Sequence, residues 1–448
     1  MVSVKSSCTV TPSNPTPESC LWLSGSDQIY PWTHVRSIHV YGPHQHQSHG
    51  GAIHTLTRSL ADILVPYYPL AGRLRSIGGG RVEVVCNAKG ALLQVAESTK
   101  TIHDYGDFRP DQPIQELLPK VDYSKPLEEI PLLLVQVTLF SGGGLCIGLA
   151  LSHSMADGYA AMQFIISWAK LARGLPLEQS DLPFLDRTVL KCCEPVMPPR
   201  FPHPEFKPLP LILGASDTDE ERKKETTVQL LKLTAEEVSK IKDRANEGAE
   251  ISRPFSRFEA VSAHIWRCVT KARRNEYQQP TTVWLVGDIR NRVSPPLPPN
   301  YFGNAVLPTV TRDGISGEVI SKPLSHAAQK IREAIGFLRE ERYVRSQLDR
   351  IEGTEQVDSL RVAYNQGGVM KQPFLGNPNM RIVSWMTLPM HEADFGWGKA
   401  VHVGPASLNA DGKVTMIHSP SDDGSILVAI RLQNAHISDF KHFLYHDL

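Results

Sequence analysis

The sequence predicts an α/β protein of two domains, and three observations support this prediction. The chain has 448 residues, more than a single hydrophobic core usually covers. Strand-like and helix-like segments mix in both halves. A proline-rich stretch without sustained periodicity separates the halves. We therefore expect an N-terminal domain at residues 1–182, a crossover linker at 183–225 and a C-terminal domain at 226–448.

The first half alternates strands and helices after a polar, proline-containing start. Apolar or alternating runs predict strands, and apolar residues at intervals of three and four predict helices. Strands are expected at 37–41, 81–86, 90–95, 131–140 and 145–151, and helices at 53–65 and 159–172. We expect the runs 81–86 and 90–95 to form a hairpin. The glycines at 78–80 fit a tight turn rather than a phosphate loop, because no helix start or lysine follows.

The second half shows the same mixture after the linker. Thr234 and Glu237 form the capping box of a helix that starts at residue 235. Further helices are expected at 258–271, 324–342 and 438–445, and strands at 226–233, 283–286, 382–390, 414–418 and 426–432.

The composition excludes several classes of protein. Lys and Arg total 47 and so do Asp and Glu, and no basic stripe suggests nucleic-acid binding. The seven cysteines show no C-x-x-C pair or paired-ligand spacing, which indicates a reduced, metal-free protein. Residues 1–17 lack the apolar core of a signal peptide, and no run has the length of a membrane span. We expect a cytoplasmic monomer that binds neither nucleic acid nor a membrane.

His153 lies where the strand at 145–151 leads into the helix at 159–172. Side chains at such edges project into clefts, and a histidine of ordinary pKa offers a neutral ring nitrogen as general base. Three roles are open to Asp157, four residues on: an orienting partner of His153, an ionic strut behind the turn, or a residue that helps start the helix. Spacing alone does not decide between them, and chemistry alone favours the helix start.

A second motif, DFGWG at residues 394–398, stands near the C-terminus. Together with HSMADG at 153–158 it resembles the plant BAHD acyl-CoA-dependent acyltransferases, which carry HxxxD mid-chain and DFGWG near the C-terminus. Three further strings agree in order and position: LSGSD at 23–27, YPLAGR at 68–73 and YFGN at 301–304. The resemblance covers essentially the whole chain.

The resemblance implies two similar domains with mixed β-sheets flanked by helices and an active-site channel between them. It also implies that acyl-CoA is a co-substrate and that no cofactor is bound permanently. His153 would take a proton from an acceptor hydroxyl or amine, which attacks the thioester carbonyl directly. Trp397 would stabilise the resulting oxyanion.

Other residues would support the site by the same resemblance. Asp157 would point away from the cleft and pair with Arg290, while Asp394 and Gly396 would shape a loop remote from the proton transfer. Ser256 and Arg292 match positions where relatives touch CoA.

The acceptor is expected to be an amine. The pattern lies closest to the hydroxycinnamoyl transferases of shikimate, quinate and spermidine, but the shikimate type carries Arg and Thr where this chain has Met370 and Val383. An apolar residue cannot replace a guanidinium that binds a carboxylate. We therefore predict a polyamine such as spermidine, with His391 and Glu392 as further acceptor-binding candidates. The alternative is O-acylation of shikimate, quinate or another alcohol.

Two other classes of function are weaker. A non-catalytic relative would lack the histidine or fill the channel, whereas His153, Asp157 and Trp397 are all present. An esterase would need a serine on a G-x-S-x-G elbow before a helix, and the sequence has none.

Overall fold

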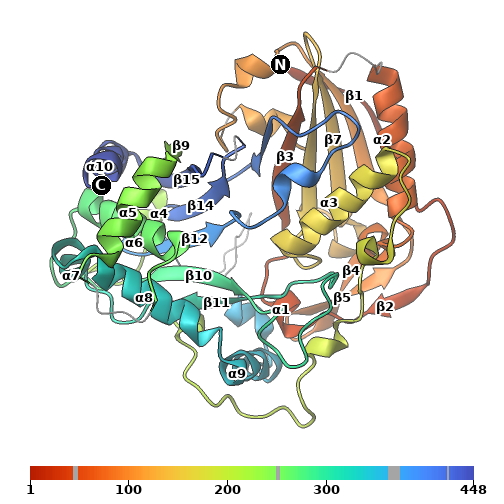
Figure 1. Cartoon of the computed structure of the whole chain (residues 1–448). Coiled ribbons are helices and arrows are strands. Elements are labelled where there is room, and N and C mark those ends of the chain that lie inside the picture. Colours follow the sequence, from red (N-terminus) through yellow and green to blue (C-terminus); the bar gives the residue numbers. More distant parts are fainter. Residues whose placement is uncertain (44–48, 112, 249–252, 362–373, 421–422) are drawn as a thin grey trace.

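The computed structural model contains two lobes, each built on a six-stranded sheet (Figure 1). It describes residues 1–43, 49–111, 113–248, 253–361, 374–420 and 423–448. Both sheets are mixed and both are flanked by helices, which confirms the fold class predicted from the sequence.

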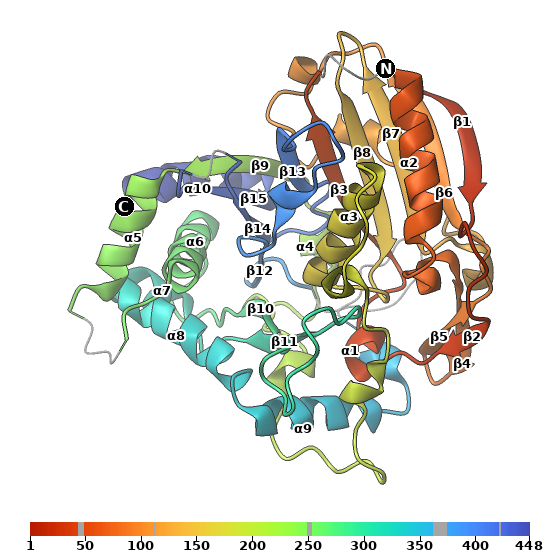
Figure 2. The ribbon, with the colours of Figure 1, turned by 45° about the vertical axis from the view of Figure 1, so that its right-hand side comes forward.

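The first sheet belongs mainly to the N-terminal half. Across the sheet its strands are β1 (Val2–Val10), β6 (Ala91–Ser98), β7 (Leu133–Phe140), β8 (Leu145–Ser152), β3 (His34–Tyr41) and β13 (His402–Pro405). β6 and β7 are parallel, and the other neighbours are antiparallel. Every residue of β7 and β8 is buried, so both strands are apolar along most of their length. Helices α2 (His49–Ile63) and α3 (Gly158–Ala172) pack side by side along this sheet (Figure 2).

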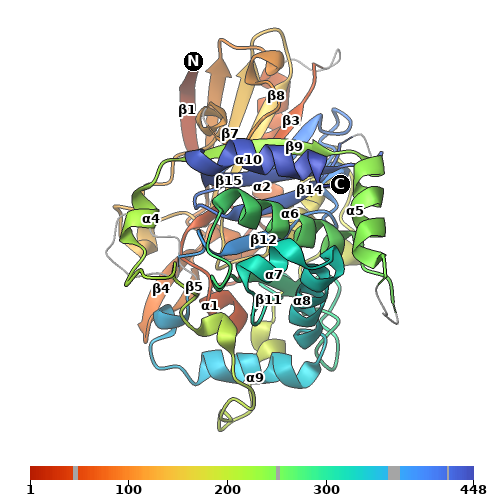
Figure 3. The same cartoon turned by 90° about the vertical axis from the view of Figure 1, so that its left-hand side faces the viewer.

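The second sheet belongs wholly to the C-terminal half. Its strands are β11 (Val306–Val310), β10 (Val283–Asp288), β12 (Met380–Ser384), β14 (Lys413–His418), β15 (Ile426–Gln433) and β9 (Thr226–Leu233). β12 runs parallel to both of its neighbours. The helices of this half are α5 (Ala235–Asn246), α6 (Arg257–Arg273), α7 (Ser316–Ser321), α8 (Leu324–Phe337), α9 (Glu341–Glu352) and α10 (Asn434–His446). Figure 3 looks onto the face where α6 lies among α5, α8 and α10.

The linker runs along both lobes and has little regular structure beyond short 3₁₀ turns and α4 (Asp219–Lys223). Its first residues are tied to the second half, because Phe184 exchanges backbone hydrogen bonds with the segment of Asn300 and Phe302, at 2.8 and 2.9 Å. The strand β9 begins at Thr226, where we place the start of the C-terminal domain. The division of the chain at 182 and 226 remains our proposal. Strand β13 comes from the C-terminal half of the chain but belongs to the first sheet.

The expected hairpin between 81–86 and 90–95 is wrong. β5 (Arg81–Cys86) pairs with β4 (Arg73–Gly78) and β2 (Ser19–Leu21) in a small separate sheet, while β6 pairs with β1 and β7. Gly90 lies between them at a φ of +86°, where a Cβ would come within 2.5 Å of the Val10 carbonyl oxygen. This close approach lets the chain leave the small sheet and enter the large one beside β1.

Two further elements differ from expectation. The single helix expected at 324–342 is two helices, α8 and α9, and the bend between them buries Leu338 and Tyr343 in one apolar cluster. The strand expected at 382–390 ends at Ser384 as β12, because the chain turns where the Leu388 amide donates to the Trp385 carbonyl at 3.1 Å. Within the described parts of the chain, no helix is both long and apolar enough to cross a membrane.

Candidate active site

His153 occupies the turn between β8 and α3, and its backbone is held on both sides. Its amide donates to the Thr33 carbonyl at 2.9 Å, and its own carbonyl accepts from Asn304 Nδ2 at 2.8 Å. The imidazole stacks on the ring of Tyr30, with centroids 4.0 Å apart and planes 16° from parallel. The ring plane of His153 is therefore fixed by packing.

Arg187 from the linker holds the next residues of this turn. Its guanidinium donates to the carbonyls of Ser154 and Met155 at 3.3 and 2.7 Å. It also pairs at 3.1 Å with Asp27, and both side chains are fully buried. Asp27 in turn accepts from Asn304 Nδ2 at 2.9 Å. The LSGSD and YFGN strings thus meet at the turn that carries His153.

Asp157 faces Arg290 on the C-terminal half. The Arg290 guanidinium donates to its two carboxylate oxygens at 2.8 and 3.0 Å. Those oxygens also accept the amides of Ala160 at 3.0 Å and Ala305 at 2.8 Å, so Asp157 is both an ionic strut and the N-cap of α3. Among the described residues, its hydrogen bonds do not include the His153 ring. This geometry favours the strut and the helix start over the orienting role.

The environment keeps His153 neutral. Burial lowers the pKa of His153 to about 4, and the positive charges of Arg381 and Lys413 act in the same direction. The backbone of His153 and the Asp157 carboxylate oppose this shift without reversing it. At neutral pH the imidazole is therefore available to accept a proton.

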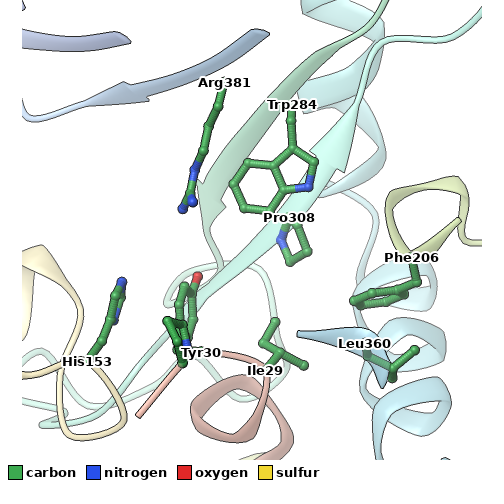
Figure 4. Close-up of a pocket in the computed structure, with 9 residues that line it drawn as sticks. Ile29, Tyr30, His153, Phe206, Trp284, Pro308, Leu360 and Arg381 are labelled. Atoms are coloured by element: carbon green, nitrogen blue, oxygen red, sulfur yellow. The ribbon is translucent and has the colours of Figure 1, made fainter. Parts of the chain in front are cut away.

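A narrow apolar cavity of about 10 Å³ lies beside His153 (Figure 4). In this view His153 and Arg381 lie on one side of the cavity, and Phe206 and Leu360 lie on the other. Three aromatic rings contribute to its wall, and the lining residues apart from His153 are Ile29, Tyr30, Pro31, Phe206, Trp284, Pro308, Leu360 and Arg381. None of these lining residues was predicted from the sequence. Except for Arg381, each is an apolar or aromatic residue of a kind that commonly lies in a protein core.

A second, polar cavity shares His153 and Arg381 with the first. Arg36 and Lys413 also line it, together with Val383, which we had predicted to lie near the acceptor. Arg381 and Lys413 are direct neighbours on the parallel strands β12 and β14. The Arg381 guanidinium lies over the ring of Trp284, 4.3 Å from its centroid. Two cations thus stand together beside the candidate base.

The DFGWG loop lies at the opposite end of α3. Asp394 Oδ1 accepts the amides of Gly396 and Gly398 at 2.7 and 2.9 Å, and Gly396 has a φ of +100°. The same carboxylate approaches Arg173 at 3.9 Å, and Arg173 is the C-cap residue of α3. Asp394 and Gly396 therefore shape a tight loop that contacts the end of the helix.

Trp397 is remote from His153. Its ring packs against Tyr41 with centroids 5.4 Å apart and stacks on Phe395 at 5.9 Å. Tyr41 pairs with Leu145, whereas Ser152, next to His153, pairs with His34 at the other end of β3. The two ends are separated by a strand rise of roughly 23 Å. The predicted oxyanion role of Trp397 does not fit this position.

The remaining predicted residues lie away from the two cavities or outside the described chain. His391 and Glu392 form part of a short 3₁₀ turn before the DFGWG loop, and Glu392 is exposed. Ser256 is the N-cap of α6 and accepts the Glu259 amide at 3.2 Å. Arg292 is half-buried after β10, near the positive charge of Arg339. Met370 lies outside the described residues.

No metal site is evident in the part of the chain that the structure describes, since no three His, Cys, Asp or Glu side chains are grouped to hold an ion.

Comparison with known proteins places this geometry in a class. The chain is similar to vinorine synthase, with a TM-score of 0.74, 20% identity and coverage of 98% of this chain and 96% of the other. It is also similar to F. graminearum TRI101 complexed with coenzyme A and deoxynivalenol, with a TM-score of 0.79, 16% identity and coverage of 95% and 97%. The fold is that of the CoA-dependent acyltransferases.

The sequence comparisons define the family. The Transferase family model matches residues 1–447. The chain is 46% identical to the hydroxycinnamoyl-CoA:piscidic acid hydroxycinnamoyltransferase of Actaea racemosa, over 100% of both chains. It is 36% identical to the shikimate O-hydroxycinnamoyltransferase of Nicotiana tabacum, over 99% of both. The chain belongs to the BAHD transferase family, and it is an acyl-CoA-dependent acyltransferase with acyl-CoA as co-substrate.

The first prediction concerns the strut. Arg290→Met leaves the buried Asp157 carboxylate without its cation, and we expect the free energy of unfolding to fall by about 3–5 kcal/mol. Urea denaturation measures this loss. The control is Lys240→Met, which removes an exposed pair with Glu236 and is expected to leave the stability nearly unchanged. Unchanged stability with abolished turnover in the Asp157→Asn variant would instead make Asp157 a direct partner in catalysis.

The second prediction contrasts the two motifs. We expect His153→Ala to lower kcat by about 10²–10⁴-fold with the fold retained. Trp397→Phe is expected to lower the melting temperature and to keep kcat within about tenfold, because its ring packs on Tyr41. A loss of about 10²–10³-fold in kcat at native stability would restore the oxyanion role.

The third prediction concerns pH. Because His153 stays neutral well below its usual pKa, kcat/KM is expected to be flat between about pH 6 and 8. Arg381→Met removes a positive charge that disfavours the imidazolium form of His153. The pKa of His153 should therefore rise, and the acid limb of the kcat/KM profile of this variant should move to higher pH. Initial rates across the range, checked for folding by circular dichroism, test both points. An acid limb centred near pH 6.5 in the wild-type protein would contradict the lowering of the His153 pKa by burial.

Proposed function

We propose that the protein transfers a hydroxycinnamoyl group from CoA to the hydroxyl of an acceptor that bears a carboxylate. The observation that carries this proposal is the Arg381–Lys413 pair beside His153. The expected location and state, a monomer in the cytoplasm, remain part of the proposal.

The apolar cavity supports the choice of donor. An aromatic acyl group is flat and apolar, and it gains most from a wall of rings and aliphatic side chains. Tyr30, Phe206 and Trp284 supply the rings, and His153 stands at the edge of the cavity. The relatives from Actaea racemosa and Nicotiana tabacum are both named for hydroxycinnamoyl transfer.

The polar cavity supports the choice of acceptor. Cationic side chains that line a cavity can bind a carboxylate through charge-assisted hydrogen bonds. Arg36 adds a third cation, and no Asp or Glu of the described chain lines this cavity. The same relatives are named for piscidic acid and shikimate as acceptors.

A polyamine fits this lining poorly. The expectation of spermidine depended on Met370 and Val383 standing where the shikimate type has an arginine and a threonine, but Arg381 on β12 and Lys413 on β14 bring cations to the site. An ammonium group there would meet like charge in a partly buried place. Glu392, the expected counter-charge, is exposed and does not line the cavity. The charge of the cavity thus favours an acceptor that bears a carboxylate over a polyamine.

The chemistry needs one proton acceptor and one fixed geometry. Neutral His153 takes the acceptor hydroxyl proton as the oxygen attacks the thioester carbonyl. The tetrahedral intermediate then breaks its carbon–sulfur bond, and the CoA thiolate receives the proton from His153. Stacking on Tyr30 and the two backbone hydrogen bonds keep the ring in place for both transfers.

The fourth prediction tests the acceptor. With p-coumaroyl-CoA as donor, we expect saturable turnover of hydroxy acids such as shikimate, quinate or malate, and little turnover of spermidine or of the methyl ester of the best acid. Lys413→Met and Arg381→Met are each expected to lower kcat/KM for the acid by about 10–100-fold, the worth of a hydrogen bond to a charged group, and to leave the ester nearly unchanged. Product identity by mass spectrometry and CoA release provide the readouts. Efficient acylation of spermidine with none of any hydroxy acid would overturn the proposal.

A further inference from the structure

The linker contributes one wall of the apolar cavity beside His153. Phe206, the last residue of a 3₁₀ turn (Pro204–Phe206), is half-buried and lines the side away from His153 (Figure 4). Trp284 and Pro308 of the same lining lie on β10 and β11, two neighbouring strands of the second sheet. Phe206 is thus a lining side chain carried by irregular backbone.

Buried polar contacts hold that backbone in place. The Glu205 carboxylate accepts from the Tyr343 hydroxyl at 3.0 Å and from His203 Nδ1 at 2.9 Å. His203 Nε2 lies 3.0 Å from Ser346 Oγ, which also accepts the Arg200 amide at 2.8 Å. Tyr343 and Ser346 both belong to α9, so these contacts fasten the turn to one helix.

This chain of serine, histidine and glutamate is not a nucleophilic triad. Ser346 is 1% exposed, and its oxygen already accepts the amides of Arg200 and Phe201. The hydroxyl hydrogen is then directed at His203, whose other nitrogen donates to Glu205. No substrate carbonyl can reach the serine, so the arrangement has a positioning role.

We propose that Phe206 limits the size of the acyl group at its aromatic end, and that the Glu205–Tyr343 and His203–Ser346 contacts position Phe206 from outside the cavity. This proposal rests on the proposed function in one respect, namely that the acyl group occupies this cavity, which has to widen from about 10 Å³ to admit it. The reacting carbonyl lies near His153, so the far end of the acyl group faces Phe206. Substituents on a hydroxycinnamoyl ring meet this side chain, and its loss makes room for them.

The experiment compares acyl donors of increasing size with one acceptor. The series runs from acetyl-CoA through butyryl-, p-coumaroyl- and feruloyl-CoA to sinapoyl-CoA. Phe206→Ala is expected to raise the ratio of kcat/KM for sinapoyl-CoA over p-coumaroyl-CoA by about tenfold or more, the usual discrimination of a pocket against extra carbon atoms. The matched control is Phe184→Ala, which removes a half-buried ring from the same linker and does not line the cavity. Its donor ratio is expected to stay within twofold of wild type.

The positioning residues are tested by the same ratio. Glu205→Gln and Tyr343→Phe are expected to shift the donor ratio toward that of Phe206→Ala, with a higher KM for the donor and kcat within about threefold. A loss of melting temperature alone, with an unchanged ratio, would make the contacts merely structural.

The outcomes also separate this proposal from the proposed function. A folded Phe206→Ala protein with unchanged ratios across the series overturns the role of Phe206, whichever donor is preferred. If the wild-type protein uses acetyl- and butyryl-CoA but no hydroxycinnamoyl-CoA, the proposed donor fails. The ratio of butyryl- to acetyl-CoA then tests Phe206 on its own.

Discussion

Two buried ion pairs hold the turn that carries His153, and the rest of the site depends on them. Asp157 pairs with Arg290 from the C-terminal half, and Asp27 pairs with Arg187 from the linker. A charge buried without its partner is costly, so neither carboxylate is tolerated unless the distant segment is in place. The turn that carries the base is therefore held in place only when both halves of the chain and the linker are assembled.

Helix α3 connects the two motifs that mark the family. Asp157 of the first motif caps its start, and Asp394 of the second approaches Arg173 at its end. The helix has 15 residues, a length of about 22 Å, which agrees with the separation between His153 and Trp397 along β3. The DFGWG loop thus supports the far end of the helix whose near end carries the turn of His153.

Local signals were readable from the sequence, and long-range partners were not. The Thr234–Glu237 capping box and the period of α6 are properties of neighbouring residues, so they were predicted closely. The hairpin failed because the pattern of β6 does not identify its partner, and β1 was missed because seven of its nine residues are exposed and most of them are polar. The HxxxD motif located His153 and Asp157. Arg187 and Asp27 lie too far apart in sequence for any spacing to relate them.

The acceptor site shows the same limit more sharply. Arg381 and Lys413 each stand at the edge of an apolar run, where a charge usually marks the end of a strand. Only the parallel pairing of β12 with β14 brings them together beside His153. Trp397 shows the opposite limit. Its motif identifies the residue in the sequence but does not say that it lies near the end of α3 remote from His153.

Strand β13 has a consequence for how the protein is made. It completes the first sheet by pairing with β3, yet it follows β8 by about 250 residues of chain. At ordinary rates of synthesis that interval is on the order of tens of seconds. Throughout it the backbone groups on one side of β3 have no strand partner, and open strand edges are templates for aggregation. The first sheet therefore stays incomplete during that interval. We expect the yield of folded protein in a cell to depend on chaperones that cover open strand edges.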